Sequence, residues 1–186
     1  MIKPPYITGF FKKLYYYFVF IPVILFLYAC PFSSTYKLDK EPAISTEDVL
    51  LGNWATMTTT KRGKQEPVKL ILSRKNDTEY NIDFTGYLYD LKPYGVMSND
   101  SIKGRAFMSA VSGRQFLNIE IKGQTYIAEV IYKNNKLSLL PLAEKFTAKY
   151  IKSNEELRLA LEVHVATRVS PVYDEPFCLW DMVRVN

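Results

Sequence analysis

The 186-residue sequence has one histidine, His164, and two cysteines, Cys30 and Cys178. A single histidine argues against multi-histidine metal sites and leaves few ways to build a Ser/His/Asp or Cys/His catalytic group. The sequence also lacks a glycine-rich phosphate loop, a Cys-x-x-Cys pair and a calcium loop. We therefore expect no catalytic residue, no cofactor and no metal site, and we expect that the protein is not an enzyme.

Acidic residues are absent from the first 30 positions, which contain Lys3, Lys12 and Lys13. The rest of the chain holds all 19 acidic residues and 21 of the 24 basic ones, so its formal net charge is only +2. No dense stripe of Lys and Arg interleaved with aromatics occurs there, so we expect no nucleic-acid partner.

An uncharged apolar run, Leu14 to Ala29, directly follows Lys12 and Lys13. Its sixteen residues fall short of the ~20 that a membrane-spanning helix needs, and Pro22 interrupts it. A short apolar run behind positive charges is typical of a secretory signal. We therefore predict that residues 1–29 are a signal peptide, with an uncleaved membrane anchor as the alternative, and either makes the membrane a partner.

The apolar run ends in Leu27-Tyr28-Ala29-Cys30, which resembles the lipobox of bacterial envelope lipoproteins. In that family, signal peptidase II cleaves before the cysteine, and fatty acyl chains such as palmitate are attached to the cysteine. The resemblance implies lipid attachment at Cys30. It also implies a domain attached to a membrane in the bacterial cell envelope, outside the cytoplasm. With Cys30 acylated, Cys178 has no disulfide partner and is interpreted as a small buried hydrophobe.

Residues 30–48 are rich in Pro, Ser and Thr with scattered charge, a composition that buries little apolar surface. We interpret them as a tether. Residues 49–186 have the length of one ordinary domain, and we expect a single β-rich domain there.

Alternation of apolar and polar residues is the main signal in that domain. The first hairpin has one face formed by Val68, Leu70 and Leu72 and a second formed by Tyr80, Ile82 and Phe84. Further runs at 103–111, 115–121, 125–132 and 136–140 are separated by Ser112-Gly113, Gly123-Gln124 and Asn134-Asn135, which predicts an antiparallel meander. The last run, 177–185, is apolar on both faces and predicts a strand that is interior to the sheet or covered on both sides.

A helix is predicted near the C-terminal end, where Ser153 and Glu156 form a capping box. The residues from Leu157 to about Val163 are good helix formers. Apolar residues from 157 to 165 also alternate, as they do in a half-buried strand, but the capping box favours the helix. His164 would then lie at the boundary of the apolar stripe.

Two further features have a structural and a functional interpretation. Adjacent Asp174 and Glu175 project differently, so we interpret them as turn residues rather than a catalytic pair. The aromatic residues are interpreted mainly as core rather than as a ligand pocket; they are Tyr80, Phe84, Tyr87, Tyr89 and Tyr94.

The start of the first strand, Gly52-Asn53-Trp54, resembles the GxW signature of lipocalins, small β-barrels that hold apolar ligands. The resemblance implies that a late basic residue such as Arg184 packs on Trp54. A convergent strand start with a buried tryptophan is the other interpretation. In both cases we expect Trp54 to be buried across the sheet from the last strand.

Together these patterns predict an α+β fold: mainly a bent antiparallel sheet or partly closed β-barrel of about eight strands with one helix, after an N-terminal signal or membrane segment. The expected function is a non-enzymatic, membrane-anchored envelope lipoprotein that binds a protein or envelope partner. The alternatives are a lipocalin-like carrier of a small apolar ligand, or a protein held by an uncleaved N-terminal transmembrane helix. An enzyme is the least favoured.

Overall fold

The computed structural model describes residues 32–59, 65–86, 101–144, 146–147, 150–167 and 173–186. The predicted signal segment and Cys30 lie outside these ranges, as do Tyr87, Tyr89 and Tyr94. Within the described ranges, no helix is both long enough and apolar enough to cross a membrane.

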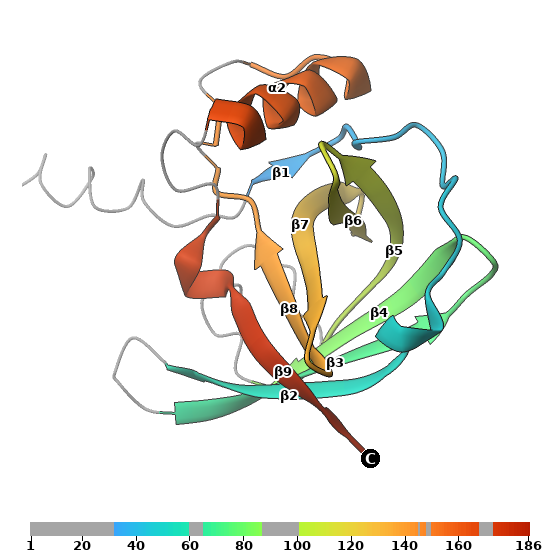
Figure 1. Cartoon of the computed structure of the whole chain (residues 1–186), viewed down its shortest axis with the longest axis vertical. Coiled ribbons are helices and arrows are strands. Elements are labelled where there is room, and N and C mark those ends of the chain that lie inside the picture. The colour runs from blue at the N-terminus through green and yellow to red at the C-terminus, as the bar shows by residue number, and fades with distance from the viewer. Residues whose placement is uncertain (1–31, 60–64, 87–100, 145, 148–149, 168–172) are drawn as a thin grey trace, which may run out of the picture. The chain divides into compact units, whose positions relative to one another are not determined.

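Nine antiparallel strands form one sheet, and eight of them close into a barrel (Figure 1). The strands are β1 (Ser33–Ser34), β2 (Gly52–Thr59), β3 (Gln65–Arg74), β4 (Glu79–Gly86), β5 (Ser101–Val111), β6 (Arg114–Ile121), β7 (Gln124–Lys133), β8 (Lys136–Pro141) and β9 (Leu179–Val185). The barrel order is β7-β6-β5-β4-β3-β2-β9-β8, and β8 pairs back with β7. The predicted eight-stranded antiparallel architecture is confirmed, with β1 as an additional strand beside β7.

Buried and exposed residues alternate along the strands, which explains why these segments form a sheet with one face in the core. In β3, Val68, Leu70 and Leu72 are buried and the residues between them are exposed. In β4, Tyr80 and Ile82 are buried while Asn81 faces solvent. The register pairs Leu70 with Phe84 and Leu72 with Ile82, so the predicted hairpin is confirmed.

Three two-residue turns connect the strands from β5 to β8. Ser112-Gly113, Lys122-Gly123 and Asn134-Asn135 all have positive φ at both positions. Such turns match the twist of antiparallel strands and favour Gly and Asn. The turn before β7 is one residue earlier than the predicted Gly123-Gln124, because β7 already begins at Gln124.

The last strand, β9, is interior to the sheet, between β2 and β8. Asp181 has a φ of 48°, and the β8–β9 register shifts between Leu137 and Leu139, which marks a β-bulge. The extra residue lets Leu179 and Met182 both be buried although they are three positions apart. The outer face of β9 is exposed, so this strand is not covered on both sides.

The barrel interior is occupied by apolar side chains from all eight barrel strands. The buried members are Leu50, Trp54, Val68, Leu70, Leu72, Tyr80, Ile82, Phe84, Ile102, Ala106, Met108, Leu117, Ile119, Ile121, Ala128, Val130, Leu137, Leu139, Leu179 and Met182. Burial of this much apolar surface is the main stabilising contribution to the fold.

Helix α2 (Asn154–Thr167) contributes to a second apolar cluster, together with the outer face of the barrel (Figure 1). This cluster contains Phe32, Leu38, Val111, Phe116, Ile127, Leu142, Phe146, Leu157 and Leu161. The predicted helix is confirmed, and the N–H of Glu156 donates to Ser153 Oγ at 3.1 Å as a capping box requires. The helix extends four residues past the expected end at Val163.

The described part of the predicted tether packs against the barrel, which corrects the expectation for residues 30–48. Phe32 and Leu38 are buried in the second apolar cluster, and residues 48–50 form the 3-10 helix η1 (Asp48–Leu50). The composition of this segment wrongly predicted a tether without fixed structure. A few buried apolar residues and one hydrogen-bonding side chain of the barrel are enough to fix a mainly polar segment. The described residues from Phe32 onward therefore belong to the β-rich unit, which does not begin only at residue 49.

That hydrogen-bonding side chain is Asn118 of β6, which is fully buried on the outer face of the barrel. Its Oδ1 accepts a hydrogen bond from the N–H of Leu38 at 2.7 Å. Its Nδ2 donates to Ser109 Oγ at 2.8 Å. A buried amide with both ends bonded fixes the N-terminal segment against β5 and β6, because an unpaired buried N–H is costly.

Replacing Asn118 with alanine should therefore leave the Leu38 N–H buried and unpaired. We expect Asn118→Ala to lower the free energy of unfolding by ~1–3 kcal/mol and to accelerate amide hydrogen exchange at Leu38. Asn81→Ala, on the solvent face of β4, is the matched control and should change stability by less than ~0.5 kcal/mol. Unchanged protection of Leu38 in Asn118→Ala would contradict the role given to this amide.

Candidate functional site

One end of the barrel is covered by the chain that leads into β2. The 3-10 helix η1 directly precedes β2 and places the Leu50 side chain in the barrel core. Trp54 is only 1% exposed, and its Nε1–H donates to the Leu50 carbonyl at 2.9 Å. The indole is therefore buried with its one polar group satisfied, as expected for a core tryptophan.

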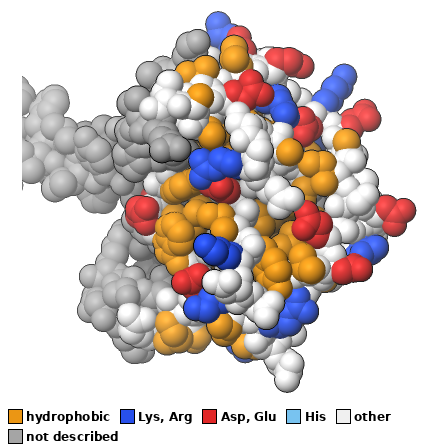
Figure 2. Space-filling model, in the orientation of Figure 1, with side chains coloured by type: hydrophobic (Ala, Val, Ile, Leu, Met, Phe, Trp, Pro, Cys, Tyr) orange, Lys and Arg blue, Asp and Glu red, His pale blue; other side chains and the backbone are white. Residues whose placement is uncertain are grey.

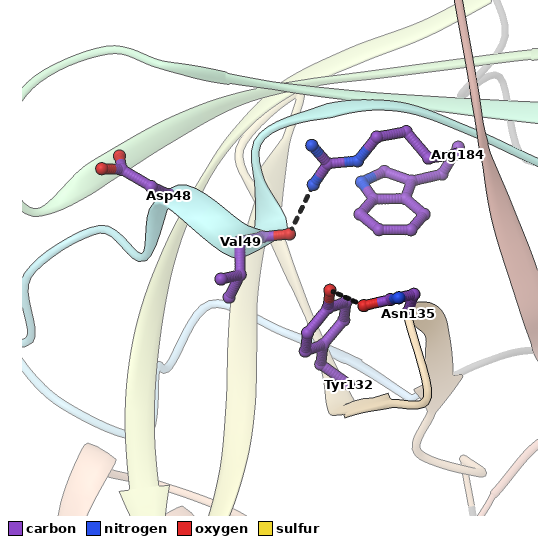
Figure 3. Close-up of a pocket in the computed structure, with 6 residues that line it drawn as sticks. Asp48, Val49, Tyr132, Asn135 and Arg184 are labelled. Carbon is purple, nitrogen blue, oxygen red and sulfur yellow. Dashed lines mark hydrogen bonds between the residues drawn. The ribbon is translucent and has the colours of Figure 1, made fainter.

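Arg184 of β9 lies opposite Trp54 of β2 in the strand register. Side chains at directly opposed positions lie on the same face of a sheet, so the guanidinium reaches over the indole, with Cζ 4.9 Å from the ring centroid. Arg184 Nη2 also donates to the Val49 carbonyl at 2.8 Å (Figure 3). The contact that the lipocalin resemblance implied between these two residues is present.

A pocket of about 440 Å³ lies at this end of the barrel. It is lined by Asp48, Val49, Trp54, Tyr132, Asn135 and Arg184. Tyr132 is 38% exposed, and its ring packs edge-to-face on Trp54 with centroids 6.2 Å apart. The hydroxyl of Tyr132 donates to Asn135 Oδ1 at 3.1 Å (Figure 3). The pocket thus combines an aromatic surface with an amide, a carboxylate and a guanidinium.

The two charged side chains of the pocket differ in their partners. Asp48 forms an ion pair with Arg74 of β3. Among the residues that the structure describes, Arg184 has no carboxylate partner, and its contacts are the Val49 carbonyl and the Trp54 ring. The pocket therefore presents a positive charge that no carboxylate of a described residue neutralises directly.

A second polar cluster lies on the outer face of the barrel, where Arg114 of β6, Glu129 of β7 and Tyr173 meet. Arg114 donates from Nε to Glu129 Oε1 at 2.6 Å and from Nη2 to Oε2, so the pair is bidentate. The Tyr173 hydroxyl donates to the same Oε2. Glu129 is only 5% exposed. The pKa of Tyr173 is raised by the burial of its own hydroxyl and by the hydrogen bond to the negatively charged Glu129.

These three residues act as a clamp. Both oxygens of Glu129 accept hydrogen bonds from Arg114, and Oε2 also accepts from Tyr173, so the carboxylate links two strands to the segment after the helix. Tyr173 follows helix α2 and pairs with Leu142 through an isolated bridge. The clamp therefore fixes the chain that returns from the helix toward β9.

The remaining residues singled out from the sequence do not come together into a site. Asp174 and Glu175 lie at the start of the 3-10 helix η3 (Glu175–Phe177), and burial raises the pKa of Asp174. Cys178 is a free, half-buried thiol whose pKa burial raises to about 12. His164 lies at the edge of the second apolar cluster, with its ring 6.0 Å from that of Phe146.

Of the aromatic residues singled out from the sequence, Tyr80 and Phe84 are core residues. The Tyr80 hydroxyl accepts a hydrogen bond from the Glu47 N–H at 2.7 Å, and burial raises its pKa. In the described part of the chain, no group of three or more His, Cys, Asp or Glu residues is arranged to hold a metal ion.

Sequence reasoning missed most of the pocket and the whole clamp. Tyr132 lies near the end of β7 and Asn135 in the turn that follows it, and the sequence pattern there predicts only a hairpin. Arg114 and Glu129 are on paired strands, but Tyr173 is 44 positions from Glu129 in sequence. No local pattern indicates such contacts, because they exist only after the barrel closes.

Comparisons with known proteins add no relatives. No protein-family model, no curated protein sequence and no solved structure matches this chain.

Alkaline pH should weaken the clamp. Because the pKa of Tyr173 is raised in the folded state, the native protein retains a proton that the unfolded chain loses near pH ~10. The stability from this group is complete below that pH and is lost as the pH rises through the native pKa. We expect the unfolding free energy to fall above pH ~10, and to fall less steeply in Tyr173→Phe.

The control for this experiment is Tyr150→Phe, because Tyr150 is highly exposed. Its pH profile should match that of the unmodified protein in urea unfolding between pH 8 and pH ~11. Tyr80 and Cys178 have raised pKa values of the same sign, so part of the alkaline loss should remain in Tyr173→Phe. Identical slopes in Tyr173→Phe and the unmodified protein would contradict the role of the clamp.

Proposed function

We propose that this chain is a bacterial envelope lipoprotein whose β-barrel is a non-enzymatic binding module. The closed antiparallel barrel is a fold that is compatible with a binding domain. The anchoring at Cys30 is supported by the lysines, the short apolar run and the Leu-Tyr-Ala-Cys ending. The domain would then lie outside the cytoplasm, attached to a membrane by acyl chains.

The observation that most supports external binding is the contrast between the interior and the outer wall. The interior is occupied by apolar side chains, whereas Trp180 and Val183 of β9 and Met57 of β2 are exposed on the outside. Trp180 is 46% exposed, and its carbonyl accepts a hydrogen bond from Thr56 Oγ1 of the neighbouring strand β2. Exposed aromatic and apolar side chains on neighbouring strands are typical of interaction surfaces.

Figure 2 shows hydrophobic side chains gathered in the region of β8 and β9, with basic and acidic groups among them. Helix α2 packs on a different part of the outer wall, the part formed by β5, β6 and β7. A partner that binds through β9 and β2 would therefore not compete with the helix.

The second candidate function is a lipocalin-like carrier of a small apolar ligand. The closed barrel and the packing of Arg184 on Trp54 favour it. The packed interior disfavours it, because a carrier holds its ligand among the side chains that here contact one another.

Anchoring can be tested at Cys30. We expect the mature protein, purified from membranes, to begin at Cys30 and to carry acyl chains. Each buried methylene contributes ~0.8 kcal/mol to membrane binding, so these chains would retain the protein at the membrane. Cys30→Ser should abolish lipid labelling and processing by signal peptidase II. The matched control is Cys178→Ser, which should be labelled and processed like the unmodified protein. Intact mass that still includes Met1 to Ala29, without lipid, would replace the lipoprotein by an uncleaved transmembrane anchor.

A further inference from the structure

The pocket at the barrel end has the chemistry of a binding site that is not part of the barrel interior. Its volume of about 440 Å³ is within the range of small-molecule sites, ~300–1,000 Å³. Val49 and Tyr132 provide exposed apolar surface, and Arg184 and Asn135 add polar groups. A mainly apolar pocket with a few directed polar groups is the usual composition of such sites.

Arg184 is the first group that specifies a ligand. The other described arginines each contact a carboxylate: Arg74 with Asp48, Arg105 with Glu120, Arg114 with Glu129 and Arg158 with Asp39. Arg184 has no such partner among the described residues, and the Val49 carbonyl accepts from only one of its amino groups. The contact with Trp54 fixes the guanidinium plane in advance. An oriented guanidinium with unused N–H groups is suited to a carboxylate.

Asn135 is the second group. Its Oδ1 accepts from the Tyr132 hydroxyl at 3.1 Å, so its Nδ2 is the end of the amide that remains to donate. The residue has a φ of 60° in the tight turn between β7 and β8, which fixes its backbone. Figure 3 shows Tyr132 and Asn135 on one side of the pocket and Arg184 on the other.

Asn135 and Tyr132 narrow the ligand class further. The Asn135 amide lies on the opposite side of the pocket from Arg184, where it can donate to a hydroxyl group of a ligand whose carboxylate is bound by Arg184. The partly exposed ring of Tyr132 can pack against the apolar C–H face of a ring. A ligand that satisfies Arg184, Asn135 and Tyr132 carries a carboxylate, a hydroxyl group and a ring with an apolar face.

We propose that this pocket binds an acidic sugar, with its carboxylate on Arg184, a hydroxyl group on Asn135 and its ring against Tyr132. The inference rests on the proposed binding role of the barrel, for which it names a ligand class. It does not depend on the membrane anchor.

The test compares two sugars of nearly equal size that differ in one oxidised carbon, D-glucuronate and D-glucose. Each is titrated into the full-length protein in detergent at pH 7, and binding is followed by ligand-observed NMR and calorimetry. We expect glucuronate to bind at least tenfold more tightly than glucose. No binding of glucuronate, or equal binding of the two sugars, would overturn the proposal.

A matched pair of variants locates the binding. Asn135→Asp keeps the shape of the side chain, its acceptor for Tyr132 and its tolerance of positive φ, but it replaces the free donor by a negative charge. It should weaken glucuronate binding at least tenfold. Asn134→Asp makes the same charge change at the preceding turn position, which does not line the pocket. It should leave the affinity within twofold.

Thermal unfolding is the control for folding: both variants should have midpoints near that of the unmodified protein. Equal loss of glucuronate binding in the two variants would mean a general charge effect and would overturn the site. Failure of the proposed pocket can be distinguished from failure of the proposed lipid anchor. A protein that is lipidated at Cys30 but binds no glucuronate contradicts only the pocket, whereas an unlipidated protein that binds it contradicts only the anchor.

Discussion

The contact between Trp54 and Arg184 is the side-chain interaction that links the strands where the barrel closes. It joins β2 to β9, which are the first and last strands of the barrel along the chain. The same two side chains donate to the carbonyls of Leu50 and Val49, so they also fix the 3-10 helix that covers this end. A guanidinium packed on a mostly desolvated indole contributes ~1–2 kcal/mol beyond the apolar area that it buries.

Outside the barrel, buried polar groups fix segments that the apolar core does not reach. Asn118 fixes the N-terminal segment, and the clamp of Arg114, Glu129 and Tyr173 fixes the return from helix α2. Both lie on the face formed by β5, β6 and β7, beneath the helix. The helix and the N-terminal segment therefore cover one side of the barrel, while the outer face of β9 and β2 remains available to a partner.

Much of the barrel could be predicted because alternation and turn residues are local signals. The hairpins followed from them, the helix followed from its capping box, and the interior position of the last strand followed from its many apolar residues. The N-terminal segment could not be predicted, since its order depends on Phe32 and Leu38 meeting a distant amide, Asn118. The contact of Arg184 with Trp54 was expected only through a family resemblance, because the two are 130 positions apart. The pocket was missed for the same reason.

The account is tested most directly by a double-mutant cycle on the barrel closure. Trp54→Leu, Arg184→Met and the double variant are compared by urea unfolding at pH 7. We predict a coupling free energy of ~1–2 kcal/mol, because each single change removes the same stacked contact. A parallel cycle between Trp54→Leu and Arg158→Met, on helix α2, should be additive within ~0.5 kcal/mol. Additivity of the Trp54 and Arg184 changes would contradict the claim that this contact couples the two strands that close the barrel.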